Sequence, residues 1–131
     1  MIRKDIYKIN IQDNLYFLVF HKKLPKGFGS SVSLYINDTE YLKFDCFGEK
    51  KGHYHIYDNV KNEEIYFSEK TCEEQINRSC ELINNINVFL NQSSRIDIKN
   101  FNIDMNKFVS KIDDIKNKML EYEYKFYSLL R

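Results

Sequence analysis

The period of the apolar residues changes near residue 70, and this change constrains the fold more than any other feature of the sequence. Before it, short runs rich in Ile, Val, Phe and Tyr alternate with polar turns, which is typical of β-strands. After it, apolar residues recur at steps of three and four, the period of an amphipathic helix. We therefore expect an α+β fold in one domain over residues 1–131, with a β-rich half at 1–68 and a helical half at 69–131.

The first half predicts an antiparallel meander of about six strands. Residues 14–21 form a continuous apolar run, which favours a strand buried on both faces. Polar residues 37–39 separate two β-rich runs and give the best hairpin signal. Residues 22–29 hold the only Pro and two of the four Gly, so we expect a loop there. The expected strands cover residues 2–11, 14–21, 32–36, 41–47, 53–57 and 64–67.

The second half predicts two helices, of which the last is long. Thr71 followed by Glu74 is a capping-box pattern, and the helical period continues from there to about residue 91. Asp104 suits the N-cap of a second helix that runs nearly to residue 131.

The last helix carries the most regular apolar pattern, an a/d heptad over about four repeats. Its two series are Met105, Ile112, Met119 and Phe126, and Phe108, Ile115, Tyr122 and Leu129. One interpretation is that this stripe packs on the preceding helix or on the sheet. The other is a partner-binding surface that includes Met119, Tyr122 and Phe126, for example in a homodimer through helix 104–130.

Composition excludes several classes of protein. With 43% hydrophobic residues and 20 Phe and Tyr rings, the chain can bury a core, so disorder is not expected. No apolar stretch is long enough to span a membrane, and the first ten residues do not resemble a secretory signal. A net charge of +1 argues against wholesale coating of nucleic acid.

The cysteines indicate a cellular compartment, and the amino-acid bias indicates a kind of genome. Cys46, Cys72 and Cys80 are odd in number and lack CxxC spacing, so we expect free thiols in a reducing cytoplasm. Asn, Lys and Ile supply about a third of the chain and Ala is absent, which favours an AT-rich bacterial or phage genome.

The segment from residue 44 to residue 55 is the strongest candidate for chemistry. His53 and His55 are two apart, so on a strand their side chains share one face. Asp45 lies on the preceding strand, across a turn that contains Lys50 and Lys51. This arrangement has three interpretations, which the motif alone leaves open.

The first interpretation is RNA cleavage without a metal or another cofactor. One imidazole would act as base and the other as acid, because the ordinary histidine pKa lies near neutral pH. Lys50 or Lys51 would stabilise the developing charge. The second is a metal site, with both histidines and Asp45, Cys46 or His21 as ligands. The third is an ordinary polar sheet face.

The run Phe44-Asp45, followed by His53-Tyr54-His55, by Glu64-Ile65-Tyr66-Phe67 and then by a helix, resembles the TumE-like toxins of bacterial toxin–antitoxin pairs. The resemblance covers roughly residues 30–90. It implies a small ribonuclease toxin, restrained by an antitoxin, in which Asp45, Lys50, His53 and His55 form the polar set. Cys46 stands where that family usually has Asn, and Gly48 and Gly52 are displaced by one position.

A basic segment, His21-Lys22-Lys23, adds a candidate phosphate contact beside aromatic residues. With Lys51, we expect Lys22 and Lys23 to bind phosphate, unless they belong to a solvated loop.

Two hypotheses of function follow. The first is a cytoplasmic ribonuclease toxin that acts on RNA and is bound by an antitoxin. The second is a non-enzymatic inhibitor, encoded by a phage or mobile element, that binds a host defence complex through its aromatic C-terminal helix.

Overall fold

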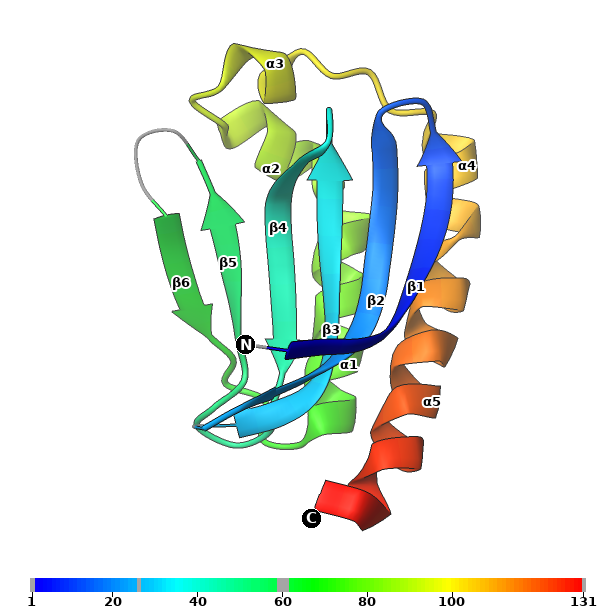
Figure 1. Cartoon of the computed structure of the whole chain (residues 1–131). Helices are drawn as coiled ribbons and strands as arrows, with labels where there is room; N and C mark the ends of the chain where they lie inside the picture. The colour runs from blue at the N-terminus through cyan, green and yellow to red at the C-terminus, as the bar shows by residue number, and fades with distance from the viewer. Residues whose placement is uncertain (1, 26, 59–61, 131) are drawn as a thin grey trace.

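Six antiparallel strands form one sheet, in which each strand pairs with its neighbours in the sequence (Figure 1). The structure is a computed structural model that describes residues 2–25, 27–58 and 62–130, with side chains from residue 3 to residue 126 of these. The strands are β1 (Ile2–Gln12), β2 (Leu15–Leu24), β3 (Gly27–Ile36), β4 (Thr39–Cys46), β5 (His53–Tyr57) and β6 (Asn62–Tyr66). The predicted α+β fold, a six-stranded antiparallel meander followed by helices, is confirmed.

Tight turns join the first four strands. Asn14 ends the first turn with a φ of 63°, and Asn37 and Asp38 form the third with φ values of 52° and 60°. Asn and Asp tolerate this left-handed conformation better than other side chains do, which explains why these residues make the turns.

The prediction of a loop over residues 22–29 is wrong, because β2 and β3 include most of these residues. Lys22 pairs with Gly29 and Leu24 pairs with Gly27, so Pro25 lies at the tip of a long hairpin. Gly29 is required here because an added Cβ would lie 2.4 Å from the backbone oxygen of Cys46 on the next strand. The glycines thus permit close approach of strands rather than a loop.

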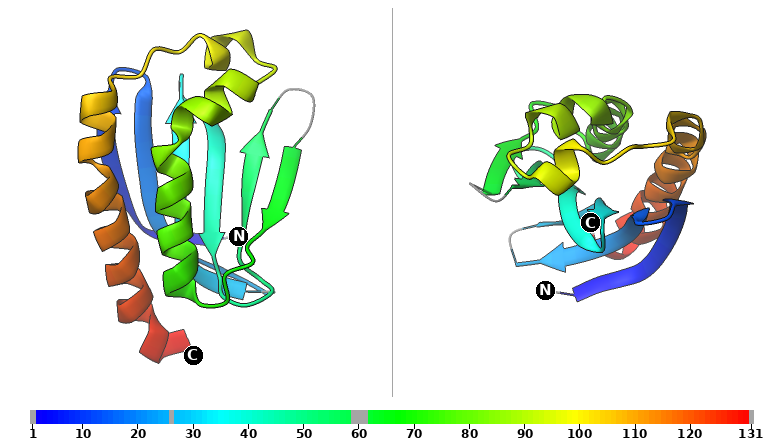
Figure 2. Two further views of the ribbon diagram at one scale, coloured as in Figure 1. Left: turned by 180° about the vertical axis from the view of Figure 1, so that it is seen from behind. Right: turned by 90° about the horizontal axis from the view of Figure 1, so that it is seen from above.

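Helices cover one face of the sheet, and the opposite face carries none of the described helices (Figure 2). Thr71 and Glu74 form the predicted capping box, and the Asp104 side chain accepts a hydrogen bond from the Lys107 backbone. Each predicted helical region is divided, the first at Asn85 and the last at Lys111. The helices are α1 (Cys72–Asn84), α2 (Ile86–Gln92), α3 (Ile96–Lys99), α4 (Met105–Ser110) and α5 (Ile112–Leu130).

The heptad stripe of the last helical region packs inside the chain. α5 lies beside α1 and against β2 and β3. Met119 is fully buried, and Tyr122 is buried with its hydroxyl donating to the Asp5 backbone oxygen. Met119 and Tyr122 therefore form part of the chain's own core rather than an exposed binding surface, and a homodimer contact through helix 104–130 stays a prediction. Phe126 is half-buried against the His21 ring, and the Leu129 side chain lies outside the described part.

None of the described helices is long and apolar enough to cross a membrane.

A substitution in α5 tests this packing. Met119→Ala should lower the free energy of unfolding by about 2–5 kcal/mol, because it leaves a cavity in the core. Urea denaturation measures this change, with the half-exposed Val109→Ala as the control that costs far less. Equal stability of the two variants would contradict the burial of the stripe.

Candidate functional site

The polar site lies on the sheet face opposite the helices, and strand alternation builds it. Lys43 and Asp45 are two apart on β4, as are His53 and His55 on β5, so all four point to one face. In the β4–β5 register, Asp45 lies opposite His53 and Lys43 lies opposite His55. Ser31 of β3 lies opposite Asp45 on its other side. Three adjacent strands therefore converge on Asp45.

Asp45 is a fully buried carboxylate surrounded by donors. It accepts a 2.6 Å hydrogen bond from Ser31 Oγ, and its Oδ2 lies 3.3 Å from Lys22 Nζ, 3.2 Å from His53 Nε2 and 4.0 Å from Lys43 Nζ. Burial alone would raise the pKa of Asp45, but the His53 hydrogen bond and the Lys22 charge hold this pKa well below its usual range. The carboxylate is thus ionised throughout the physiological pH range.

The pKa values of the two lysines shift in opposite directions. Burial lowers the pKa of Lys22. Burial also acts to lower the pKa of Lys43, but the charge of Asp45 and the hydrogen bond to Tyr57 together raise it.

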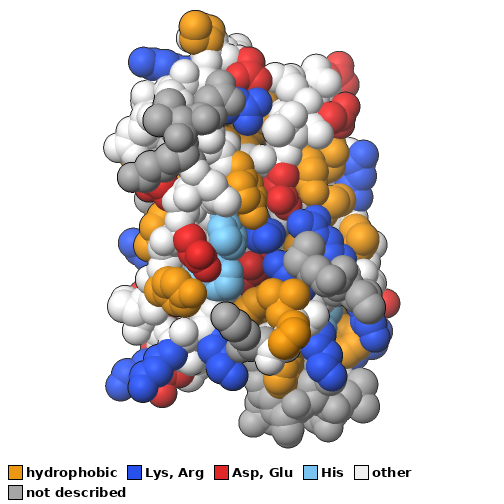
Figure 3. Space-filling view, turned by 60° about the vertical axis from the view of Figure 1, so that its left-hand side comes forward, with side chains coloured by type: hydrophobic (Ala, Val, Ile, Leu, Met, Phe, Trp, Pro, Cys, Tyr) orange, Lys and Arg blue, Asp and Glu red, His pale blue; other side chains and the backbone are white. Residues whose placement is uncertain are grey.

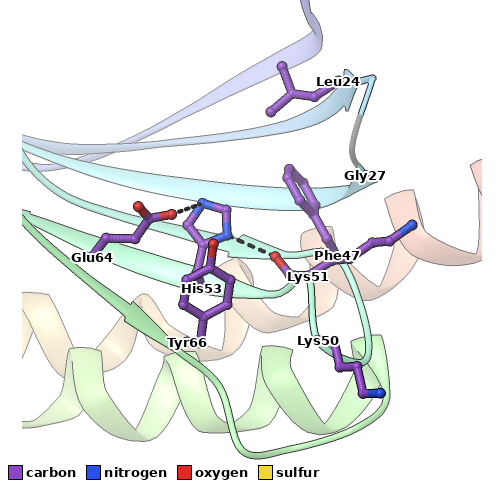
Figure 4. A pocket seen from close by; sticks show the side chains of 8 residues that line it. All are labelled: Leu24, Gly27, Phe47, Lys50, Lys51, His53, Glu64 and Tyr66. Carbon is purple, nitrogen blue, oxygen red and sulfur yellow. Dashed lines mark hydrogen bonds and ion pairs between the residues drawn. The ribbon is translucent and has the colours of Figure 1, made fainter.

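His53 is held between acceptors on both sides of its ring (Figure 4). Its Nδ1 donates to the Lys51 backbone oxygen at 2.8 Å, while Nε2 lies 3.2 Å from Asp45 Oδ2 and 3.6 Å from Glu64 Oε1. Burial would lower the pKa of His53, but the hydrogen bonds to Asp45 and to the Lys51 carbonyl raise it. This environment favours the protonated imidazolium.

His55 has the opposite environment. Its ring centroid lies 4.9 Å from that of His53 in a T-shaped contact, and the ring stacks on Tyr57 at 5.4 Å. Nδ1 is shielded from solvent and has no hydrogen-bond partner among the described residues. Burial, then the charges of Lys43 and His53, lower the pKa of His55. The neutral imidazole is therefore favoured, and it remains available as a proton acceptor.

A pocket of about 530 Å³ opens beside His53. Figure 3 shows histidine side chains in a hollow of this face, bordered by acidic and basic side chains. Two aromatic residues and one carboxylate, Glu64, line the pocket together with residues of the Gly48–Gly52 turn. The lining residues are Leu24, Gly27, Phe47, Lys50, Lys51, His53, Glu64 and Tyr66.

The structure brings together part of the predicted site. Asp45, His53, His55 and Lys22 meet, although Lys22 is buried and ion-paired rather than an exposed phosphate contact. Lys23 alternates with Lys22 on β2 and so points away from this face.

Lys50 and Lys51 line the pocket rim, with ammonium groups that point away from His53 (Figure 4). The catalytic role expected for Lys50 is therefore not supported by its position. Phosphate binding by the exposed Lys51 stays a prediction.

Sequence reasoning missed three residues of the site, Lys43, Glu64 and Tyr66. Lys43 could have been found, because Lys43 and Asp45 have the same two-residue step as the histidines and must share their face. Glu64 and Tyr66 lie opposite His55 and His53 on β6, so the same alternation would have placed them once that hairpin register was known.

Asp45, His53 and His55 also offer ligand atoms within 4.8 Å of one another, which is one part of a metal site. The other expected ligands lie elsewhere, because Cys46 contacts Ser79 of α1 and His21 packs on Phe126. Lys22 and Lys43, within 4.0 Å of Asp45, already supply positive charge to the carboxylate and would repel a cation. The electrostatics favour an anion here.

Fold and site together describe a small α+β domain with a buried Asp–His centre on the sheet face opposite the helices. The chain belongs to the family described as a domain of unknown function, DUF7700, whose profile matches residues 12–119. Neither the comparison with curated proteins nor the comparison with solved structures gave a match.

A double-mutant cycle tests the buried ion pair. Asp45→Asn should lower the free energy of unfolding by about 3–5 kcal/mol, because Lys22 is left as an uncompensated buried charge. Adding Lys22→Met should recover part of this loss, giving a coupling of about 0.5–3 kcal/mol in urea denaturation. The exposed Arg78–Glu81 pair is the matched control, with a coupling below about 1 kcal/mol. Strictly additive losses at Lys22 and Asp45 would show that the pair does not interact.

Proposed function

We propose that this protein cleaves RNA by transphosphorylation at the Asp45–His53–His55 site, with no metal ion. The observation that carries the proposal is a pair of imidazoles with ring centroids 4.9 Å apart, of which only His53 contacts the buried carboxylate of Asp45. Their environments shift the pKa of His53 up and that of His55 down. Such a pair supplies an acid and a base at the same pH, which is what phosphodiester cleavage requires.

The residues then have distinct roles. The neutral His55 takes the proton of the ribose 2′-hydroxyl, whose oxygen attacks the adjacent phosphorus. The bond from phosphorus to the 5′-oxygen breaks, and His53 donates its Nε2 proton to that oxygen. The products are a 2′,3′-cyclic phosphate and a free 5′-hydroxyl, and proton exchange with water restores both imidazoles.

Asp45 prepares His53 for this step, and Glu64 makes room for the substrate. Asp45 keeps the ring protonated and oriented, and because it is buried it stays in contact with the ring when RNA binds. Glu64 is nearly half-exposed and lies 3.6 Å from Nε2, longer than a good charge-assisted hydrogen bond. RNA can therefore replace Glu64 at Nε2 while the contact to Asp45 persists.

The charge of the site supports an anionic substrate. Lys22, Lys43 and the His53 imidazolium outnumber the carboxylates of Asp45 and Glu64. Lys43 lies opposite His55 in the register and is the more exposed of the two lysines. Its ammonium is therefore the group that would stabilise charge developing on the phosphate.

We further propose that the ribonuclease acts in the cytoplasm as the toxin of a toxin–antitoxin pair. Its support is the resemblance of the Asp45, His53 and His55 pattern to TumE-like toxins. The alternative, an inhibitor that binds a defence complex through the C-terminal helix, loses its main support, because Met119 and Tyr122 lie in the core. Such an inhibitor would need another surface.

Histidine variants test the catalytic proposal. His55→Ala and His53→Ala should each reduce cleavage of a fluorescently labelled single-stranded RNA by about 10²–10⁴-fold, because each removes one proton-transfer group. The control is Lys107→Ala, an exposed residue of α4 on the helical layer, which should cleave at the wild-type rate.

Two further readouts accompany the rates. The product should carry a 2′,3′-cyclic phosphate by mass spectrometry, and EDTA should leave the rate unchanged. Wild-type cleavage by either histidine variant, with its fold intact by circular dichroism, would refute the assignment, as would full inhibition by EDTA.

A further inference from the structure

The pocket beside His53 has the features of a base-binding site. Its volume of about 530 Å³ exceeds that of one nucleobase, and it adjoins the imidazole that we assign as the acid. The sheet edge forms it, since Glu64 and Tyr66 belong to β6, and Phe47 follows β4. This pocket is therefore an adjacent place for the base of a nucleotide whose phosphate lies at His53 and His55.

Tyr66 is the natural stacking platform. Tyr66 is 59% exposed, which is high for a large aromatic residue, so it is accessible to a ligand. The ring lies 5.4 Å from that of His53, so a base stacked on it stays next to the reacting phosphate. Exposed aromatic rings of this kind bind the faces of unpaired RNA bases, whichever base is present. Tyr66 therefore explains affinity but not selectivity.

Glu64 supplies the selectivity. It is the one carboxylate among the described residues that line the pocket, and an ionised carboxylate only accepts hydrogen bonds. Its two oxygens match a base edge that presents two adjacent donors. The guanine edge does so through N1–H and the N2 amino group. Adenine and cytosine offer one amino group beside an acceptor nitrogen, and uracil offers one N–H between two carbonyls.

We infer that this pocket is a guanine subsite, in which Glu64 accepts from N1–H and N2–H and Tyr66 stacks on the base. The inference rests on the proposed function and names its substrate preference. It also links recognition to chemistry, because a guanine that engages Glu64 draws this carboxylate away from His53 Nε2. The leaving 5′-oxygen can then take the place of Glu64 at Nε2, where Asp45 remains the other acceptor of the Nε2 proton.

Binding of the four ribonucleoside 3′-monophosphates, followed by NMR titration of the intact chain, tests the subsite without any cleavage step. The guanosine nucleotide should bind at least about tenfold more tightly than the other three, in line with one good bidentate contact. Glu64→Gln should abolish this preference, because an amide presents a donor to one of the two guanine donors. Tyr66→Ala should weaken the binding of all four nucleotides and retain the preference for guanosine.

Glu63→Gln is the matched control. Glu63 is the preceding exposed residue of β6, and strand alternation points it to the other face. The Glu63→Gln variant should bind the four nucleotides with wild-type affinities. Equal affinity for the four nucleotides, or a guanosine preference that survives Glu64→Gln, would overturn the guanine subsite.

The same experiment separates this inference from the proposed function. Guanosine preference in a chain that cleaves no RNA would support the subsite and refute the ribonuclease. Conversely, RNA cleavage through His53 and His55 with no preference at guanosine would support the ribonuclease and refute the subsite.

Discussion

The buried negative charge of Asp45 is the interaction on which the site depends. An ionised carboxylate without water is stable only if donors surround it, and Ser31, Lys22, His53 and Lys43 fill this role. These residues come from four different strands. The same charge therefore also raises the pKa of His53, while burial, with the charges of Lys43 and His53, lowers the pKa of His55.

The fold makes this burial possible on a face that has no described helix above it. The β2–β3 hairpin continues past the expected loop, so Lys22 reaches Asp45 from a strand two positions away in the sheet. Gly29 allows this hairpin to approach β4 at its end. On the other face, α1 and α5 supply the core, which leaves the polar face free to carry function.

The sequence predicted those parts of the site that depend on local geometry. Strand alternation placed His53 and His55 on one face, and the short turn placed Asp45 beside them, because a hairpin register needs few residues to define it. The burial of Lys22 depends on pairing across three strands, which local pattern does not encode. Glycine in residues 22–29 indicated a loop because its other role, close approach between strands, appears only when the neighbouring strand is in place. The heptad stripe was compatible with both a partner and the chain's own core, and only the position of α5 on the sheet decides between them.

The opposite protonation of two neighbouring imidazoles is the central claim, and an NMR titration of the histidine ring protons between pH 5 and pH 9 tests it most directly. The account predicts that His53 titrates above the ordinary value of 6.5 and His55 below it, and that Asp45→Asn lowers the pKa of His53. Two imidazoles that both titrate near 6.5, or a His55 that titrates above His53, would contradict it.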